Sequence, residues 1–310
     1  MKNLLSLGIL CLVLIVVLIR VFFYAPGWLR CPCTARKCSR NTQSCCGCSG
    51  GNCCSSEKAS DGSQATKEII KGAYSKVAKT SGSVCPMGGC CGGGGKLSED
   101  IGYSKEQIEA LADANLGLGC GNPTDLGQIK AGNTVLDLGS GAGLDCFLAA
   151  HKVGEKGKVI GVDMTQAMID KARKNAQKYK INNVEFRLGD IENLPVDSAS
   201  VDVIMSNCVI NLAPNKEKVF AEAFRALKHG GSMAISDVVL TGNLTEEQKH
   251  NEKLLSACVS GAILKEDYLA LLKQAGFTVT IIDEDKEIST KWFGHNNLPI
   301  SSLKFIAYKK

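Results

Sequence analysis

The stretch that decides the fold of this 310-residue chain is VLDLGSGAG at residues 135–143. A short apolar run, an acidic residue within it and glycines at every second position predict a buried strand that turns sharply into a helix. Glycines in such a turn also let the backbone approach a bound ligand closely. The pattern is G-x-G-x-G rather than the G-x-G-x-x-G of dinucleotide folds. We therefore expect a nucleotide-type ligand at this turn.

Predicted strands and helices alternate from residue 133 onward, which is typical of βαβ units and a parallel sheet. Strands are expected at 133–138, 158–163, 183–188, 201–206, 232–238, 277–283 and 302–309. Helices are expected at 143–153, 166–179, 215–228, 245–256 and 265–275. Seven strands is the count of the common S-adenosylmethionine-dependent fold. The predicted class is therefore α/β, a class I methyltransferase domain with a Rossmann-like seven-stranded sheet over residues 133–310.

Acidic residues recur at the ends of the first three predicted strands. Asp163 ends the second strand, where a carboxylate can accept hydrogen bonds from both ribose hydroxyls of a nucleotide. Asp190 follows the third strand, where an adenine amine would lie. The residues predicted to bind the nucleotide-type ligand, which in this fold is the methyl donor, are Asp137, Gly139, Gly141, Asp163, Met164, Asp190, Ile191 and Asn207. The alternative is a turn that binds another nucleotide, or none.

Residues 1–30 are predicted to be a membrane anchor. The run from Leu4 to Ile19 is uncharged and rich in Leu, Ile and Val, and with Arg20 extending to the interface the segment 4–24 is long enough to span. A cleaved signal peptide is the alternative, but the run is long and no small-residue cleavage site follows it. Basic residues after the span outnumber those before it. The positive-inside rule therefore predicts a single-pass protein with its catalytic body in the cytoplasm.

Basic charge is concentrated in the N-terminal arm. Residues 1–60 contain seven basic residues and one acidic residue, so the arm carries +6 and the remainder −1 of the formal net charge of +5. The body therefore lacks the basic excess that a nucleic-acid surface needs, and no nucleic-acid partner is expected.

Nine of the 16 cysteines lie in residues 1–54. Adjacent cysteines are difficult to pair within one fold, and a cytosolic body keeps its cysteines reduced, so we expect thiols rather than a disulfide framework. Residues 31–64 are rich in Cys, Ser and Gly, which predicts a disordered linker.

The region 65–132 is predicted to hold short helices and cysteine loops ahead of the sheet. A helix over 65–79 would place Ile69, Ile70, Ala73 and Val77 on one apolar face. The S-x-x-Q pattern at 104–107 predicts a capping box and a second helix to about residue 112.

Three cysteines occupy predicted loops beyond residue 100. Cys208 follows the fourth strand, in SNCVINL at 206–212, and in folds of this type that loop faces the methyl donor. A thiol there suggests a substrate held by sulfur. Cys120 lies in a loop of small residues that would bury it poorly, and Cys258 follows a predicted helix. Cys146 lies on the helix after the glycine turn, where packing explains it.

These segments carry a resemblance. From about residue 67 to 282 the chain is similar to arsenite methyltransferases, through NLGLGCGNP at 115–123, VLDLGSGAGLD at 135–145, SNCVINL at 206–212 and CVSGA at 258–262. The resemblance implies S-adenosylmethionine as methyl donor and arsenic bound by Cys120, Cys208 and Cys258. It also implies an upstream cysteine in thiol exchange, for which Cys85, Cys90 and Cys91 are alternatives. The family does not usually carry the membrane anchor or the Cys31–Cys54 cluster.

The implied chemistry suits these residues. Trivalent arsenic is soft and favours thiolates, and three of them can hold it as a pyramid whose lone pair faces the sulfonium methyl. Such a transfer needs neither a general base nor a catalytic metal ion. The oxidised arsenic must then be reduced, and neighbouring thiols can do this by closing a disulfide that a thioredoxin- or glutathione-type reductant reopens. The expected partners are arsenite or its thiol conjugates, this reductant, and the membrane.

Two other functions fit the sequence. One is methylation of a small organic or lipid substrate, which would need a general base or a broad apolar cavity near Cys208. The other is a membrane-tethered thiol protein that sequesters soft metals, against which the intact donor residues argue. The Cys31–Cys54 cluster has three interpretations: capture or delivery of arsenic or soft metal ions, acylation of Cys31 and Cys33 near the membrane, or a linker without specific chemistry.

Overall fold

The structure is a computed structural model that describes residues 62–79, 98–126, 128–294 and 297–310. The predicted anchor, nearly all of the predicted 31–64 linker, and the loop with Cys85, Cys90 and Cys91 lie outside the described residues. The chain divides into two units, Met1–Ser56 and Glu57–Lys310, and the described residues belong to the second. No helix among the described residues is long and apolar enough to cross a membrane.

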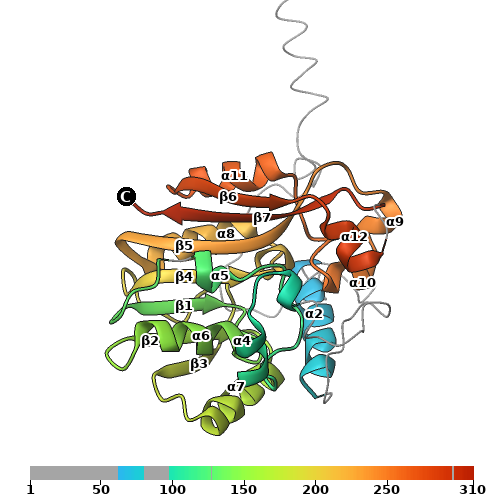
Figure 1. Cartoon of the computed structure of the whole chain (residues 1–310). Coiled ribbons are helices and arrows are strands. Elements are labelled where there is room, and N and C mark those ends of the chain that lie inside the picture. Colours follow the sequence, from blue (N-terminus) through green and yellow to red (C-terminus); the bar gives the residue numbers. More distant parts are fainter. Residues whose placement is uncertain (1–61, 80–97, 127, 295–296) are drawn as a thin grey trace, which may run out of the picture. The chain divides into compact units, whose positions relative to one another are not determined.

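A single seven-stranded sheet organises the second unit (Figure 1). Its strands are β1 (Thr134–Leu138), β2 (Lys158–Asp163), β3 (Val184–Leu188), β4 (Val201–Asn207), β5 (Leu227–Leu240), β6 (Thr278–Asp285) and β7 (Ile300–Tyr308). The order is β3-β2-β1-β4-β5-β7-β6, and the strands are parallel except β7, which is antiparallel to both neighbours. This is the predicted class I methyltransferase sheet. All seven strands overlap the predicted ranges, and β5 is much longer than expected.

Helices cover both faces of the sheet because the side chains of its strands alternate. In β1, Val135 packs in a core with α6 (Leu144–Val153) and α7 (Gln166–Tyr179), whereas Leu136 packs in a second core with α8 (Lys216–Ala226) and α11 (Lys265–Gln274). Both side chains are fully buried. Burial on both faces is why the strands of the parallel part read as continuous apolar runs.

The predicted helix over 245–256 is instead two short helices, α9 (Glu246–Lys249) and α10 (Glu252–Ser256). The break occurs at Asn251, whose side-chain oxygen accepts hydrogen bonds from the N–H groups of Lys253 and Leu254 and so starts a new helix. The predicted second helix is α4 (Lys105–Ala110), and its capping box is confirmed. Three elements were not predicted: α5 (Pro123–Leu126), the 3₁₀ turn η2 (Ile210–Leu212) and α12 (Ile288–Phe293).

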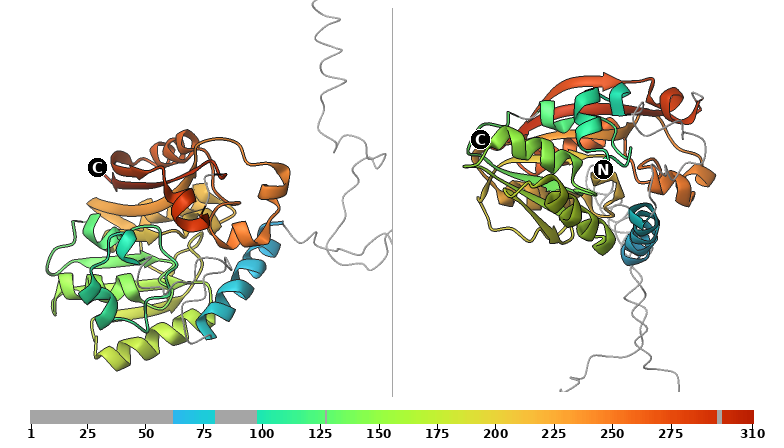
Figure 2. Two further views of the ribbon diagram at one scale, coloured as in Figure 1. Left: turned by 45° about the vertical axis from the view of Figure 1, so that its right-hand side comes forward. Right: turned by 60° about the horizontal axis from the view of Figure 1, so that its bottom comes forward.

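Helix α2 (Gly62–Lys79) packs against α7 and α10 (Figure 2), lying across the edge where the parallel strands end. It begins at Gly62, three residues before the predicted start of this helix at residue 65. Ile70 is buried as expected, but Ile69 is 38% exposed. The buried face continues through Val77, as expected, and Tyr74 also packs on it, because residues three to four positions apart are adjacent on one side of a helix.

Candidate active site

The glycine turn after β1 has the geometry that its sequence predicts. Gly139 has a φ of +70°, and a Cβ there would lie 2.3 Å from a methyl carbon of Val209, so only glycine fits. The N–H groups of Gly139 and Ser140 both donate to the carbonyl of Val162, which fixes the turn against β2. The backbone of the turn thus lies open on the side that faces the carboxyl ends of the strands.

A pocket lies at this edge, and every predicted donor-binding residue lines it. The eight residues are Asp137, Gly139, Gly141, Asp163, Met164, Asp190, Ile191 and Asn207. Cys208 lines the same pocket. Residues that sequence reasoning missed also contribute: Lys67, Ile70 and Tyr74 from α2, Tyr103 before α4, and Ser140 and Asp145 beside the glycine turn.

Asp163 is positioned by the backbone. Its carboxylate accepts hydrogen bonds from the N–H of Gly141 at 3.0 Å and of Thr165 at 2.8 Å. Burial raises the pKa of Asp163, and these hydrogen bonds counteract the rise. The hydroxyl of Ser140 is buried, lines the pocket and has no hydrogen-bond partner among the residues that the structure describes. A polar ligand with hydroxyl, amine and carboxylate groups, as S-adenosylmethionine has, fits this set of groups.

Two buried carboxyl groups line the pocket. Asp137 and Asp145 are 2% and 9% exposed, and Tyr103 donates to Asp145 at 2.6 Å. Burial raises the pKa of Asp145 to about 6, and burial together with the charge of Asp145 raises the pKa of Asp137 well above its usual range. A ligand with positive charge would offset this repulsion, as an ammonium or sulfonium group does. Sequence reasoning missed Asp145, although it lies two residues after the glycine turn.

Cys146 is fully buried on α6, as packing predicts for it. Its thiol donates a hydrogen bond to Asp137 at 3.1 Å, a contact that the sequence did not indicate. Burial raises the pKa of Cys146, so the thiol stays protonated.

Asn207 connects the donor pocket to the loop that carries Cys120. Its side-chain oxygen accepts the N–H of Cys120 at 2.9 Å, and its amide group donates to the carbonyl of Gly121 at 2.8 Å and to Tyr103 at 2.9 Å. A Cβ at Gly119 would lie 2.5 Å from the amide nitrogen, so the loop needs glycine to approach this closely. Asn207 therefore lines the predicted pocket while its amide holds the Cys120 loop against the end of β4.

The structure brings Cys120, Cys208 and Cys258 together. Cys120 and Cys208 form a disulfide with a Cα–Cα distance of 5.9 Å, and the thiol of Cys258 donates to the carbonyl oxygen of Cys208 at 2.6 Å. The three cysteines belong to one buried cluster. The predicted convergence is observed, whereas the expectation that these cysteines are all thiols is wrong for the joined pair. Their Cα distance lies within the range that a disulfide bridges without backbone movement.

Both Cys208 and Cys258 have left-handed backbone conformations, with φ of +56° and +64°. Only two other non-glycine residues in the described part of the chain have positive φ. Such a conformation costs roughly 1 kcal/mol or more for a residue with a Cβ. Strained backbone of this kind is a common feature of functional sites.

A buried polar network lies behind the cysteines. Asp237, at the end of β5, accepts hydrogen bonds from Asn211 at 2.9 Å and Tyr268 at 3.1 Å, and burial raises its pKa to about 7. Burial raises the pKa of Cys258, and the charge of Asp237 raises it further, whereas Tyr74 and Lys216 lower it. Cys258 is therefore a protonated thiol at neutral pH. Within the described part of the chain, no group of His, Cys, Asp and Glu side chains is arranged to hold a metal ion.

Comparison with known proteins gives a consistent result. The family model described as "Methyltransferase domain" matches residues 129–276. A curated arsenite methyltransferase of Halobacterium salinarum is 46% identical over 75% of this chain, and one of Homo sapiens is 41% identical over 46% of it. The crystal structure of an arsenic(III) S-adenosylmethionine methyltransferase from Chlamydomonas reinhardtii is 32% identical, covers 68% of this chain and 72% of its own, and has a TM-score of 0.52.

The lengths of these proteins differ. The chain spans 63% of the length of the Halobacterium protein and 40% of the human one.

Proposed function

Because the chain belongs to the arsenite methyltransferase family, we propose that it transfers a methyl group from S-adenosylmethionine to trivalent arsenic bound by Cys120, Cys208 and Cys258. One observation carries the proposal: Cys208, which lines the donor pocket, also contacts both of the other cysteines. A soft ligand held by the three sulfurs would therefore lie beside the pocket.

The pocket residues have distinct roles in holding the donor. Asp163 accepts hydrogen bonds from the ribose hydroxyls, and Asp190 accepts one from the adenine amine. The carboxylates of Asp137 and Asp145 favour the positive charge of the donor. When bound, S-adenosylmethionine supplies an electrophilic methyl group.

The cysteines bind and orient the substrate. Each thiol that replaces a hydroxyl of arsenite releases one water, so three thiols bind arsenite with no net release of protons. The sulfurs hold arsenic in a fixed position, and positioning is the main contribution when a reaction needs no proton removal. The lone pair of arsenic would form the new bond to carbon while the carbon–sulfur bond of the donor breaks and its electron pair stays on sulfur. S-Adenosylhomocysteine would then leave, and arsenic would have gone from the trivalent to the pentavalent state.

The disulfide between Cys120 and Cys208 suits the step in which pentavalent arsenic is reduced to the trivalent state. Reduction of pentavalent arsenic takes two electrons, and two thiolates provide them when they form a disulfide. In that oxidised form only Cys258 of the three is a free thiol. An external reductant of thioredoxin or glutathione type would then restore Cys120 and Cys208. Cys85, Cys90 and Cys91 remain candidates for thiol exchange.

The test is the reaction itself. The full-length chain, kept reduced by an excess of a small thiol, is incubated with arsenite and S-adenosylmethionine, and arsenic species are separated by chromatography and quantified by mass spectrometry. Methylarsenic species that depend on both substrates and disappear in Cys208→Ser support the proposal. Absence of methylated arsenic from a protein that binds S-adenosylhomocysteine would contradict it.

We also propose that residues 4–24 anchor the protein in a membrane with the body in the cytoplasm. The support is the uncharged run from Leu4 to Ile19 and the excess of basic residues after it. Deleting residues 1–30 should convert a membrane-bound protein into a soluble, active one. A full-length protein that fractionates as soluble would contradict the anchor, and protease protection of residue 310 in intact cells would distinguish the two orientations.

A further inference from the structure

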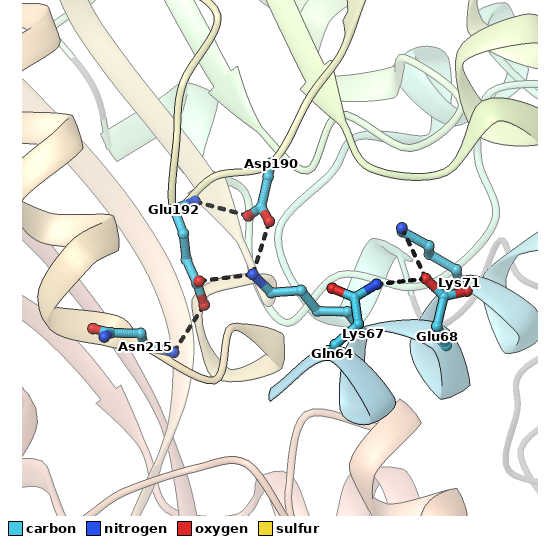
Figure 3. Close-up of polar contacts among 7 residues, drawn as sticks. All are labelled: Gln64, Lys67, Glu68, Lys71, Asp190, Glu192 and Asn215. Carbon is cyan, nitrogen blue, oxygen red and sulfur yellow. Dashed lines mark hydrogen bonds and ion pairs between the residues drawn. The ribbon is translucent and has the colours of Figure 1, made fainter. Parts of the chain in front are cut away.

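An ion cluster that no motif indicates lies at the pocket, where we propose that adenine binds (Figure 3). Lys67 on α2 contacts the carboxylate of Asp190 at 2.8 Å and that of Glu192 at 2.7 Å. Its side chain is only 12% exposed. Lys67 and Asp190 are 123 residues apart in sequence, and both line the pocket.

The two carboxylates are held in different ways. Glu192 is 8% exposed and also accepts the N–H of Asn215, the N-cap of α8, at 2.8 Å. Asp190 is 37% exposed; one of its oxygens accepts the N–H of Glu192 at 2.9 Å and the other contacts Lys67. Without the ammonium group the two neighbouring carboxylates would repel each other, and of these two contacts Asp190 would keep only the hydrogen bond from the N–H of Glu192.

Several contacts hold helix α2, and with it the backbone of Lys67, in place. Ile70 and Tyr74 lie on the same helical face and also line the pocket, and Ile70 is 1% exposed. Farther along the helix, Tyr74 donates to the carbonyl of Ser256 at 3.1 Å, and Lys171 of α7 donates to that of Ala78 at 3.3 Å. The helix that carries Lys67 is therefore fixed relative to Asp190 by packing and hydrogen bonds.

We propose that Lys67 is a positioning residue for the methyl donor, whose ammonium holds Asp190 in the orientation that accepts the exocyclic amine of adenine. The inference rests on the proposed function, since it requires the donor to occupy this pocket. Helix α2 thereby fixes the orientation of Asp190 through the side chain of Lys67. Burial lowers the pKa of Lys67, but the hydrogen bonds to Asp190 and Glu192 and the charges of these carboxylates together raise it by more. The ammonium group is therefore charged at neutral pH.

The test compares two ligands that differ only at the adenine amine. The affinities of the full-length protein for S-adenosylhomocysteine and for its analogue with hydrogen in place of that amine are measured by calorimetry. We expect wild type to prefer the amine-bearing ligand by about tenfold or more, the scale of a hydrogen bond to a charged group. In Lys67→Met this preference should fall to about threefold or less, because one of the two contacts that orient the Asp190 carboxylate is lost.

Lys71→Met is the matched control. Lys71 lies one turn further along α2, and among the described residues it pairs with Glu68 of the same helix alone, 3.2 Å away (Figure 3). It should retain the wild-type preference. In an Asp190→Ala background, Lys67→Met should change the preference no further, because Lys67 acts through Asp190. If Lys67→Met does not fold, Lys67→Gln removes the charge with a smaller loss of polar contact.

Three results would decide against the inference or its premise. Equal weakening of both ligands by Lys67→Met would mean that Lys67 serves only to hold α2, and would overturn the inference. The same conclusion follows if wild type binds both ligands equally. Failure of wild type to bind S-adenosylhomocysteine at all would instead contradict the proposed function.

Discussion

The thiol of Cys258 lies 2.6 Å from the backbone carbonyl oxygen of Cys208 and donates a hydrogen bond to it. The two residues are 50 positions apart, one after α10 and the other at the end of β4. Both have positive φ, so each chain segment turns at its cysteine. The thiol is thus held beside the donor pocket in a protonated state, and it must leave this hydrogen bond to bind a soft ligand.

We predict that Cys258→Ser and Cys208→Ser each abolish arsenite methylation while leaving donor affinity unchanged. A hydroxyl is a poor ligand for a soft centre, whereas the donor contacts remain in place. Arsenic speciation measures the first effect and calorimetry with S-adenosylhomocysteine the second. Cys146→Ser provides a buried cysteine for comparison, and it should cost about 1–2 kcal/mol of stability while methylation persists. Methylation that survives Cys258→Ser would remove that residue from the arsenic site.

We predict that arsenite binding requires reduction of the disulfide between Cys120 and Cys208. The joined pair leaves one free thiol of the three, which is too few to hold arsenic as a pyramid. The measurement is equilibrium dialysis of arsenite, with the cysteines at positions 1–91 replaced by serine so that they do not bind it. Reduced protein should bind one equivalent and oxidised protein almost none. In Cys120→Ser the weaker binding that remains should no longer depend on reduction.

The sheet and the donor pocket could be predicted from sequence because their determinants are local. At residues 135–143 an apolar run is followed directly by glycines, and the apolar runs of the second and third strands are each followed by an aspartate. All eight predicted donor residues line one pocket for this reason. The break at Asn251 was missed because a cap and a solvent-facing asparagine look alike in a helical pattern.

The contacts between distant segments could not be predicted. Nothing near Lys67 in the sequence indicates that it meets Asp190, and Ile69 and Ile70 are equally apolar although only Ile70 is buried. Asn207 lines the pocket as predicted, but the sequence did not indicate that its amide would also hold the Cys120 loop. These facts depend on how α2 and the Cys120 loop cross the sheet edge, which is a property of the folded chain.

We predict that Asp163→Ala weakens S-adenosylmethionine binding by about 1.5–3 kcal/mol, the scale of hydrogen bonds to a charged acceptor. Asp163 is oriented by the N–H groups of Gly141 and Thr165, so its loss also frees the glycine turn. Calorimetry gives the affinity, and the thermal unfolding midpoint of the variant shows whether the fold is kept. Unchanged donor affinity in a folded variant would place the ribose elsewhere.

We predict that donor affinity rises with pH through the titration of Asp145. Burial raises the pKa of this carboxyl to about 6, above its unfolded value, so between about pH 4 and 6 the folded protein holds a proton that the unfolded chain has released. The contribution of Asp145 to stability is therefore present below pH 4, is lost as pH rises through 6, and stays lost at neutral pH.

A cationic ligand favours the ionised form of Asp145, and its binding must therefore release protons at low pH. The affinity for S-adenosylmethionine should be about tenfold weaker at pH 5 than at pH 7.5, since one pH unit below the pKa corresponds to about 1.4 kcal/mol. Calorimetry in buffers of different ionisation enthalpy counts the protons released. Asp145→Asn cannot ionise, so its affinity should change little over this range. Parallel pH profiles for the two proteins would show that another group carries the effect, and Asp137, which shares the floor of the pocket, would be the next to test.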